Sequence, residues 1–245
     1  PHEPGPGPRG VQGGRLWGWS KFYRITSALF MSVLSKICLA GLLGCLGAVA
    51  TQGCREALFA LEYALYGITD GHLVAAAEGL PLWRRAVTPA LGALGAGLIL
   101  WAWGKRQRRR GGPPSANDYL DAVRTDNGRL DAPACLIKVL ASICVVVTGN
   151  SIGREGAMIL LAALAASVTA KRLAGYGELK LWTACGVAAG ISSAYHAPLA
   201  GGLFIAEIFF GEFRLRSIWP AFIAAGAAWA ITEQFGGVPA SIYHL

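Results

Sequence analysis

The sequence predicts an all-helical membrane protein that crosses the bilayer several times. Of its 245 residues, 54% are hydrophobic and 15% are charged, and the mean hydropathy is +0.45. The 33 glycines fit this class, because small residues let membrane helices approach one another closely. The net charge of +8 comes from basic residues gathered at the ends of apolar runs, where they act as topology signals. A soluble domain and a nucleic-acid-binding protein are therefore both disfavoured.

The first two membrane spans are expected to form a hairpin. Residues 1–24 are basic and rich in proline and glycine, and they predict a cytoplasmic tail that precedes a transmembrane domain over residues 25–245. An apolar run from Ile25 to about Tyr66 is long enough to cross a bilayer with tilt. A second span from about Val87 to Trp103 stops at the basic cluster 105–110. Because basic segments stay on the cytoplasmic side, the N-terminus is predicted to be cytoplasmic.

Beyond Pro114 the apolar segments become shorter, and several fall below the roughly 20 residues that cross a bilayer squarely. Ser115 or Asn117 is the expected N-cap of the first of them. Transporter folds use short helices interrupted by glycine or proline to aim a positive N-terminus at an anion within the membrane. Helices are expected over 115–123, 132–147, from about 154 to 172, over 178–194, over 198–210 with proline first, and over 218–231.

The most informative feature is the sequence Gly-Arg-Glu-Gly at 153–156, which places two charges in an apolar stretch. Between residues 132 and 170, the only ionisable residues besides cysteine are Lys138, Arg154 and Glu155. Charged groups at membrane depth cost a few kcal/mol, and they usually mark an ion path or a proton relay. Glycines let the backbone approach an ion, and a helix start offers free N–H groups. We therefore predict an anion site here, where the Glu155 carboxylate can occupy the anion's place.

A structural ion pair is the alternative interpretation of Arg154 and Glu155. Adjacent residues of a helix point about 100° apart, so these two side chains cannot pair well with each other. His196, next to a helix break at Ala197 and Pro198, is interpreted mainly as a structural residue, with a pH-sensing role as the alternative. The six cysteines form no metal-binding pattern, so no metal and no cofactor are expected, and an enzyme is disfavoured.

Residues 153–156 resemble the G-[RK]-E-G-P signature of the CLC family of chloride channels and chloride/proton antiporters. A second stretch, residues 186–190 followed by 195–201 and 204–207, is similar to the next conserved block of that family. The resemblance covers about Ile25 to Leu245 and is greatest to a bacterial branch described as voltage-gated-type chloride channels of the inner membrane. It implies a CLC-type fold of short, tilted and broken helices, of which this chain is the N-terminal half of an inverted repeat.

The resemblance also implies roles for individual residues. Glu155 corresponds to the external gating glutamate. The family's upstream Gly-Ser-Gly-Ile-Pro motif, whose serine contacts the anion, is absent, and Ser115 is the nearest hydroxyl, with anion ligand and helix cap as equal alternatives. Where the signature has proline, this chain has alanine, which leaves the gating role intact. The implied anion-binding residues are Gly153, Arg154, Gly156, Ala157 and, if it is a ligand, Ser115.

One further departure concerns proton transport. Antiporters of the family carry an internal glutamate just after the position of Glu207, and this chain has Ile208 there. Isoleucine cannot relay protons, so channel behaviour is favoured, while a proton path through Glu207 or water stays open. A structural role for Glu207 is the favoured alternative to a proton relay.

The predicted function is passive chloride conduction across a bacterial inner membrane, with a role as an electrical shunt in acid resistance. A chloride/proton or fluoride/proton antiporter is the first alternative. A non-conducting membrane scaffold or a truncated product is the alternative from another class. The expected partners are chloride as the transported ion, the lipid bilayer and a second copy of the chain, which the resemblance implies would pack through the helices after Pro198 and Ile218.

Overall fold

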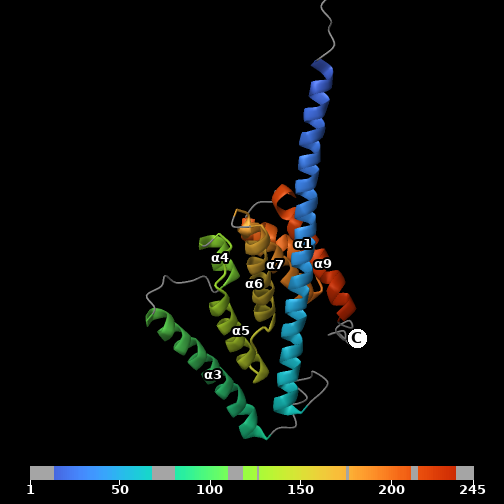
Figure 1. Cartoon of the computed structure of the whole chain (residues 1–245). Coiled ribbons are helices and arrows are strands. Elements are labelled where there is room, and N and C mark those ends of the chain that lie inside the picture. The colour runs from blue at the N-terminus through green and yellow to red at the C-terminus, as the bar shows by residue number, and fades with distance from the viewer. Residues whose placement is uncertain are drawn as a thin grey trace, which may run out of the picture. The chain divides into compact units, whose positions relative to one another are not determined.

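The computed structural model describes residues 14–67, 81–109, 118–125, 127–174, 177–210 and 215–235. Every regular element in these ranges is a helix, which confirms the predicted all-helical class (Figure 1). The contacts within the chain define two units, residues 1–38 and residues 39–245. The first unit holds the N-terminal part of helix α1, and the candidate site lies wholly in the second.

The two N-terminal helices are longer than their apolar cores. Helix α1 spans Gly14–Tyr66, so it begins within the segment predicted as a tail. Helix α3 spans Leu82–Arg109 and includes basic residues that were expected to follow the second span. The polar ends were missed because an apolar run marks the part of a helix that can lie in lipid and leaves its basic extensions unmarked.

Three described helices are long and apolar enough to cross a membrane, namely residues 33–66 of α1, all of α3, and α6 (Glu155–Leu173). Two shorter apolar helical segments cover Ala132–Val147 and Pro198–Phe210. Helix α5 is the first of these (Ala132–Val147), and its bounds agree with the prediction. At about 1.5 Å per residue, its 16 residues reach about 24 Å, less than a bilayer core.

The remaining elements refine the expected boundaries. Helix α4 spans Tyr119–Thr125, and the helix predicted from residue 115 is capped by Asp118, whose Oδ1 accepts the Leu120 N–H at 3.1 Å. The expected caps, Ser115 and Asn117, lie outside the described residues. The segment predicted as one helix over 198–210 divides into α8 (Pro198–Phe204) and a π-helical turn η1 (Ile205–Phe210). Helices α7 (Leu179–Tyr195) and α9 (Leu215–Phe235) complete the described chain.

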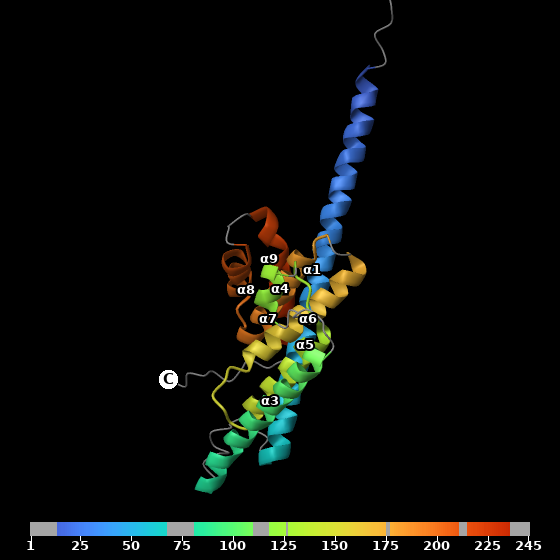
Figure 2. The ribbon, with the colours of Figure 1, turned by 90° about the vertical axis from the view of Figure 1, so that its left-hand side faces the viewer.

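Small residues hold the centre of the second unit together. Helix α7 is buried along most of its length between α6 and α9 (Figure 2). A Cβ added at Gly186 would lie 2.8 Å from the Ala162 carbonyl oxygen, and one added at Gly190 would lie 2.9 Å from the Cα of Ile159. These glycines therefore have the helix-packing role that the sequence predicted.

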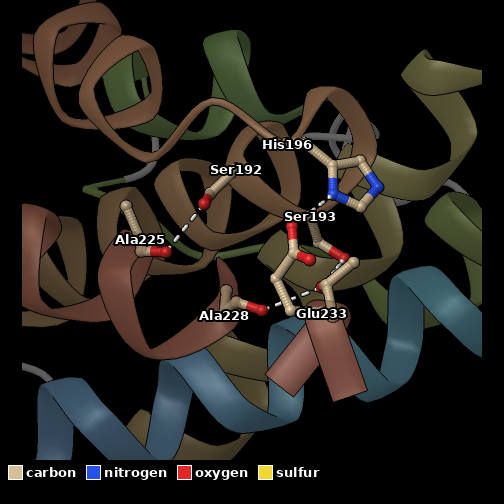
Figure 3. A network of polar contacts seen from close by, with 7 residues as sticks. Ser192, Ser193, His196, Ala225, Ala228 and Glu233 are labelled. Carbon is tan, nitrogen blue, oxygen red and sulfur yellow. Dashed lines mark hydrogen bonds and ion pairs between the residues drawn. The ribbon is translucent and has the colours of Figure 1, made fainter. Parts of the chain in front are cut away.

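Polar contacts also join α7 to α9 (Figure 3). Ser192 donates to the Ala225 carbonyl at 2.7 Å. The Thr232 hydroxyl donates to the Ala228 carbonyl, so Ser193 is the donor in its 2.7 Å contact with Thr232. At the end of α7, His196 has a left-handed backbone (φ +55°), and its Nδ1 lies 3.3 Å from a Glu233 carboxylate oxygen. This contact gives His196 a structural place at the break between α7 and α8.

Candidate functional site

The loop between α5 and α6 begins with a glycine-dependent helix end. Gly149 has a positive φ of +88°. Its N–H donates to the Val146 carbonyl at 3.0 Å, and the Asn150 N–H donates to the Val145 carbonyl at 3.3 Å. This pair of bonds is the Schellman arrangement, in which glycine avoids the penalty that a Cβ meets in the left-handed region. The chain thus leaves α5 sharply and reaches α6 within a few residues.

The start of α6 carries unsatisfied donors. Arg154 occupies the N-cap position with φ −67° and makes no side-chain capping bond. The first four N–H groups of a helix have no partner within it, and together with the helix dipole they form a region of partial positive charge. Residues 151–154 and Gly156 are exposed, so this positive end is open in the described part of the chain.

The Glu155 carboxylate folds back over this helix start. A Cβ added at Gly153 would lie 2.6 Å from Glu155 Oε2. The carboxylate therefore occupies the space that any side chain at residue 153 would need. Glycine at this position leaves room for an anionic group beside the α6 N-terminus, which is the arrangement that binds anions in proteins.

The charges near the site come from separate helices. Arg154 is exposed and interacts electrostatically with Glu62 in the last turns of α1. Glu155 interacts electrostatically with Tyr195 at the end of α7. Among the described residues, no ion pair joins Arg154 to Glu155. Glu62 was not predicted from the sequence, although an acidic residue in an apolar span is itself a signal, and Tyr195 was named only as part of the family-like block 195–201.

The other predicted site residues are not all brought together. Gly153, Arg154, Gly156 and Ala157 lie at one helix start, while Ser115 lies outside the described residues. Glu207 is exposed on η1, beside the exposed Ile208. Within the described ranges, no ion pair joins Glu207 to Arg154.

An aromatic contact and an ion pair connect α4 to its neighbours. The Tyr119 ring at the start of α4 stacks on Phe209 with centroids 6.4 Å apart, which places η1 beside α4. Lys138, the third charge of the apolar stretch, lies 2.6 Å from an Asp118 carboxylate oxygen. This ion pair between α4 and α5 explains how a lysine is tolerated in an apolar helix.

No group of three or more metal-ligating side chains occurs among the described residues.

Comparisons with known proteins agree with these features. A family model described as voltage gated chloride channel matches residues 92–244, more than half of the chain. The chain is 50% identical over 213 residues to the voltage-gated ClC-type chloride channel ClcB of Yersinia pseudotuberculosis serotype O:1b, with 87% of this chain and 51% of that protein covered. It is 50% identical over 208 residues to the ClcB protein of Salmonella typhi, with 85% and 49% covered.

A similar match, 47% identity over 210 residues, is found with the ClcB protein of Shigella flexneri, with 86% and 50% covered. The chain spans about half the length of the curated relatives it matches. The fold is all-helical, several helices are apolar enough to cross a membrane, and the family match includes the Gly-Arg-Glu-Gly site. The chain therefore belongs to the voltage-gated chloride channel (CLC) family.

Proposed function

We propose that this chain forms part of a passive chloride pathway in which Glu155 is the gate. The observation that carries the proposal is the position of the Glu155 carboxylate, folded back beside Gly153 at the uncapped start of α6. A carboxylate and a chloride ion are attracted to the same partial positive charge. When the carboxylate holds this place, chloride is kept out, and when it is protonated or swings away, chloride can enter.

The proposed anion ligands are the backbone groups near Gly153, Arg154, Gly156 and Ala157. Ala157 is buried, while the three residues before it in this set are exposed, so the anion would approach from the open side of the α6 start. Ser115 is proposed as an additional ligand because it is the hydroxyl nearest to the position of the family's motif serine, although that motif is absent from this chain. The pathway requires no cofactor, since chloride itself is the transported ligand.

Channel behaviour is favoured over proton-coupled exchange by Ile208. This apolar residue is 42% exposed on η1, at the position where antiporters of the family carry a proton-relaying glutamate. The relatives that the chain matches are named chloride channels. A chloride/proton or fluoride/proton antiporter that uses Glu207 or water is the second candidate, because Glu207 is exposed beside Ile208. A passive pathway would serve as an electrical shunt in acid resistance.

The proposed setting is a bacterial inner membrane, with the N-terminus on the cytoplasmic side and two copies of the chain in contact. Large apolar side chains are exposed on α8 and α9, where the family resemblance puts the dimer contact. An apolar surface of this kind is covered either by lipid or by a partner. They are Leu199 and Leu203 on α8, and Trp229 and Phe235 on α9.

Chloride efflux from proteoliposomes, with and without a proton ionophore, tests the proposal. The proteins compared are this chain, a version extended to the full length of its relatives, and Glu155→Ala in each. Efflux that Glu155→Ala alters, without proton movement, supports a channel gated by Glu155. Uphill proton movement would establish the antiporter instead. Absence of efflux from every version would leave the scaffold interpretation.

A further inference from the structure

The side chain of Asn150 connects the loop before the gate to a different helix. Its Nδ2 donates to the Pro89 carbonyl of α3 at 3.1 Å, to the Val145 carbonyl at 3.1 Å and to the Thr148 hydroxyl at 3.2 Å. The Thr148 hydroxyl donates in turn to α5 carbonyls, so it accepts from Asn150. All three neighbours are acceptors, and this settles the orientation of the amide.

Helix α3 is shaped to receive this contact. Pro89 lies inside α3, and its carbonyl oxygen has two lone pairs, so it can accept the Asn150 amide in addition to a bond of the helix. One turn later, Gly92 is buried, and a Cβ added there would overlap the Thr148 side chain. Gly92 and Ala96 form the buried face of α3, which runs beside α5 (Figure 1). The C-terminal end of α5 therefore packs closely against α3 at Gly92, near the Pro89 carbonyl.

After Asn150 the loop has little packing of its own. The Ile152 N–H donates to the Asn150 carbonyl at 2.8 Å, and residues 151–154 are exposed. Asn150 is thus the last residue anchored by its side chain to another helix before the chain reaches Gly153 and the donors of α6. The position of those donors depends on the position of Asn150.

We infer that Asn150 is a positioning residue for the anion site, which it holds in place through α3. The inference rests on the proposed function and adds a structural support outside the family's signature. Loss of the amide would free the loop from α3, so that the α6 N–H groups would no longer be aligned on one anion position. Chloride would then bind more weakly, even where the protein remains folded.

The test is the chloride dependence of flux in the full-length version carrying Asn150→Leu, which keeps the side-chain shape but removes the donors. We expect the half-saturating chloride concentration to rise about fivefold, the scale set by the loss of one net hydrogen bond. Thr88→Val on α3 is the matched control, because it removes a hydroxyl that bonds to the Arg84 carbonyl of the same helix and leaves the Asn150 contacts in place. Its half-saturating concentration should stay unchanged.

A merely structural role predicts a different result, namely lower maximal flux with an unchanged half-saturating concentration, and that result would overturn the inference. If Asn150→Leu fails to fold, Asn150→Ser and calorimetric chloride binding in detergent take its place, and unchanged affinity there would overturn it as well. Absence of chloride flux from the unsubstituted full-length protein would contradict the proposed function instead, so the two failures are distinguishable.

Discussion

At the scale of single residues, the proposed gate depends on one carboxylate and one missing side chain. Glu155 supplies a negative charge that can lie beside the α6 N-terminus, and Gly153 leaves the room it needs. The carboxylate can lie in this position only when residue 153 is small, because a bulkier residue 153 would displace it. Both effects are testable by substitutions that leave the buried face of α6 intact.

Glu155→Gln in the full-length version should raise chloride efflux at neutral pH. The amide has the shape of the acid but lacks its charge. A charge-assisted hydrogen bond contributes about 1.5–3 kcal/mol, so its loss should increase the open population about 10- to 100-fold. Glu207→Gln serves as the control. Efflux from Glu155→Gln that equals or falls below that of the unsubstituted protein would contradict the proposed gate.

Gly153→Ala should lower efflux, by a few-fold, because the new Cβ takes the space that Glu155 Oε2 and the proposed chloride share beside the α6 start. The carboxylate is the end of a flexible side chain, so it can move away without disturbing the backbone, but the anion position stays obstructed. In a Glu155→Ala background the same substitution should lower efflux as well. Unchanged efflux in the double variant would show that chloride does not take the place of the carboxylate.

At the scale of helices, close packing of α6 against α7 fixes the helix that carries the proposed gate. Helix α6 presents small residues to Gly186 and Gly190, and the same arrangement brings Tyr195 within electrostatic range of Glu155. Helix ends matter as much as helix faces, because Gly149 ends α5 and His196 ends α7 in left-handed conformations. The Asn150 contact extends this support to α3.

Gly186→Val should destabilise the protein by about 1–3 kcal/mol or more, the cost of overpacking a close contact. The added side chain would meet the Ala162 carbonyl and the Ala166 methyl group, and a backbone atom cannot move aside cheaply. Thermal unfolding in detergent measures the effect. Gly226→Ala on α9 is the control, because an added Cβ there meets nothing within 4 Å. Equal unfolding temperatures for both variants would contradict the packing role of Gly186.

The bounds of the helices could be predicted where apolar runs end at strong signals. Helix α5 and the break before Pro198 agree with the prediction, because proline and glycine mark them in the sequence. The start of α1 at Gly14 does not, since polar residues continue a helix without any hydropathy signal. The cap at Asp118 does not either, because Ser115, Asn117 and Asp118 all have side chains suited to capping. The division of residues 198–210 into α8 and η1 likewise has no signal in the sequence.

At the scale of the whole molecule, the chain spans about half the length of its relatives, and that half contains the proposed gate. A pathway needs walls on all sides, whereas the α6 start is open in the described part of the chain. The remaining wall is proposed to come from the region that the relatives have in addition. The exposed apolar residues of α8 and α9 leave room for a second copy.

Extension to the full length of the relatives should therefore create chloride efflux that this chain alone lacks. Proteoliposomes with equal amounts of each protein provide the measurement, and the extended Glu155→Gln variant shows whether the efflux uses the proposed gate. Cross-linking in the same membranes reports whether two copies associate. Efflux from the 245-residue chain alone would contradict the expectation and would place a complete pathway within it.

The amino-acid sequence determined the membrane class, the family and the Gly-Arg-Glu-Gly site, because composition and short motifs are local properties. Only the tertiary structure decided that the Glu155 carboxylate lies over Gly153, that Lys138 pairs with Asp118, and that Asn150 bonds to α3. Asn150 and Pro89 are 61 positions apart. Such contacts depend on how separate helices pack, and helix packing is set by the shapes of whole faces, so no single stretch of sequence encodes it.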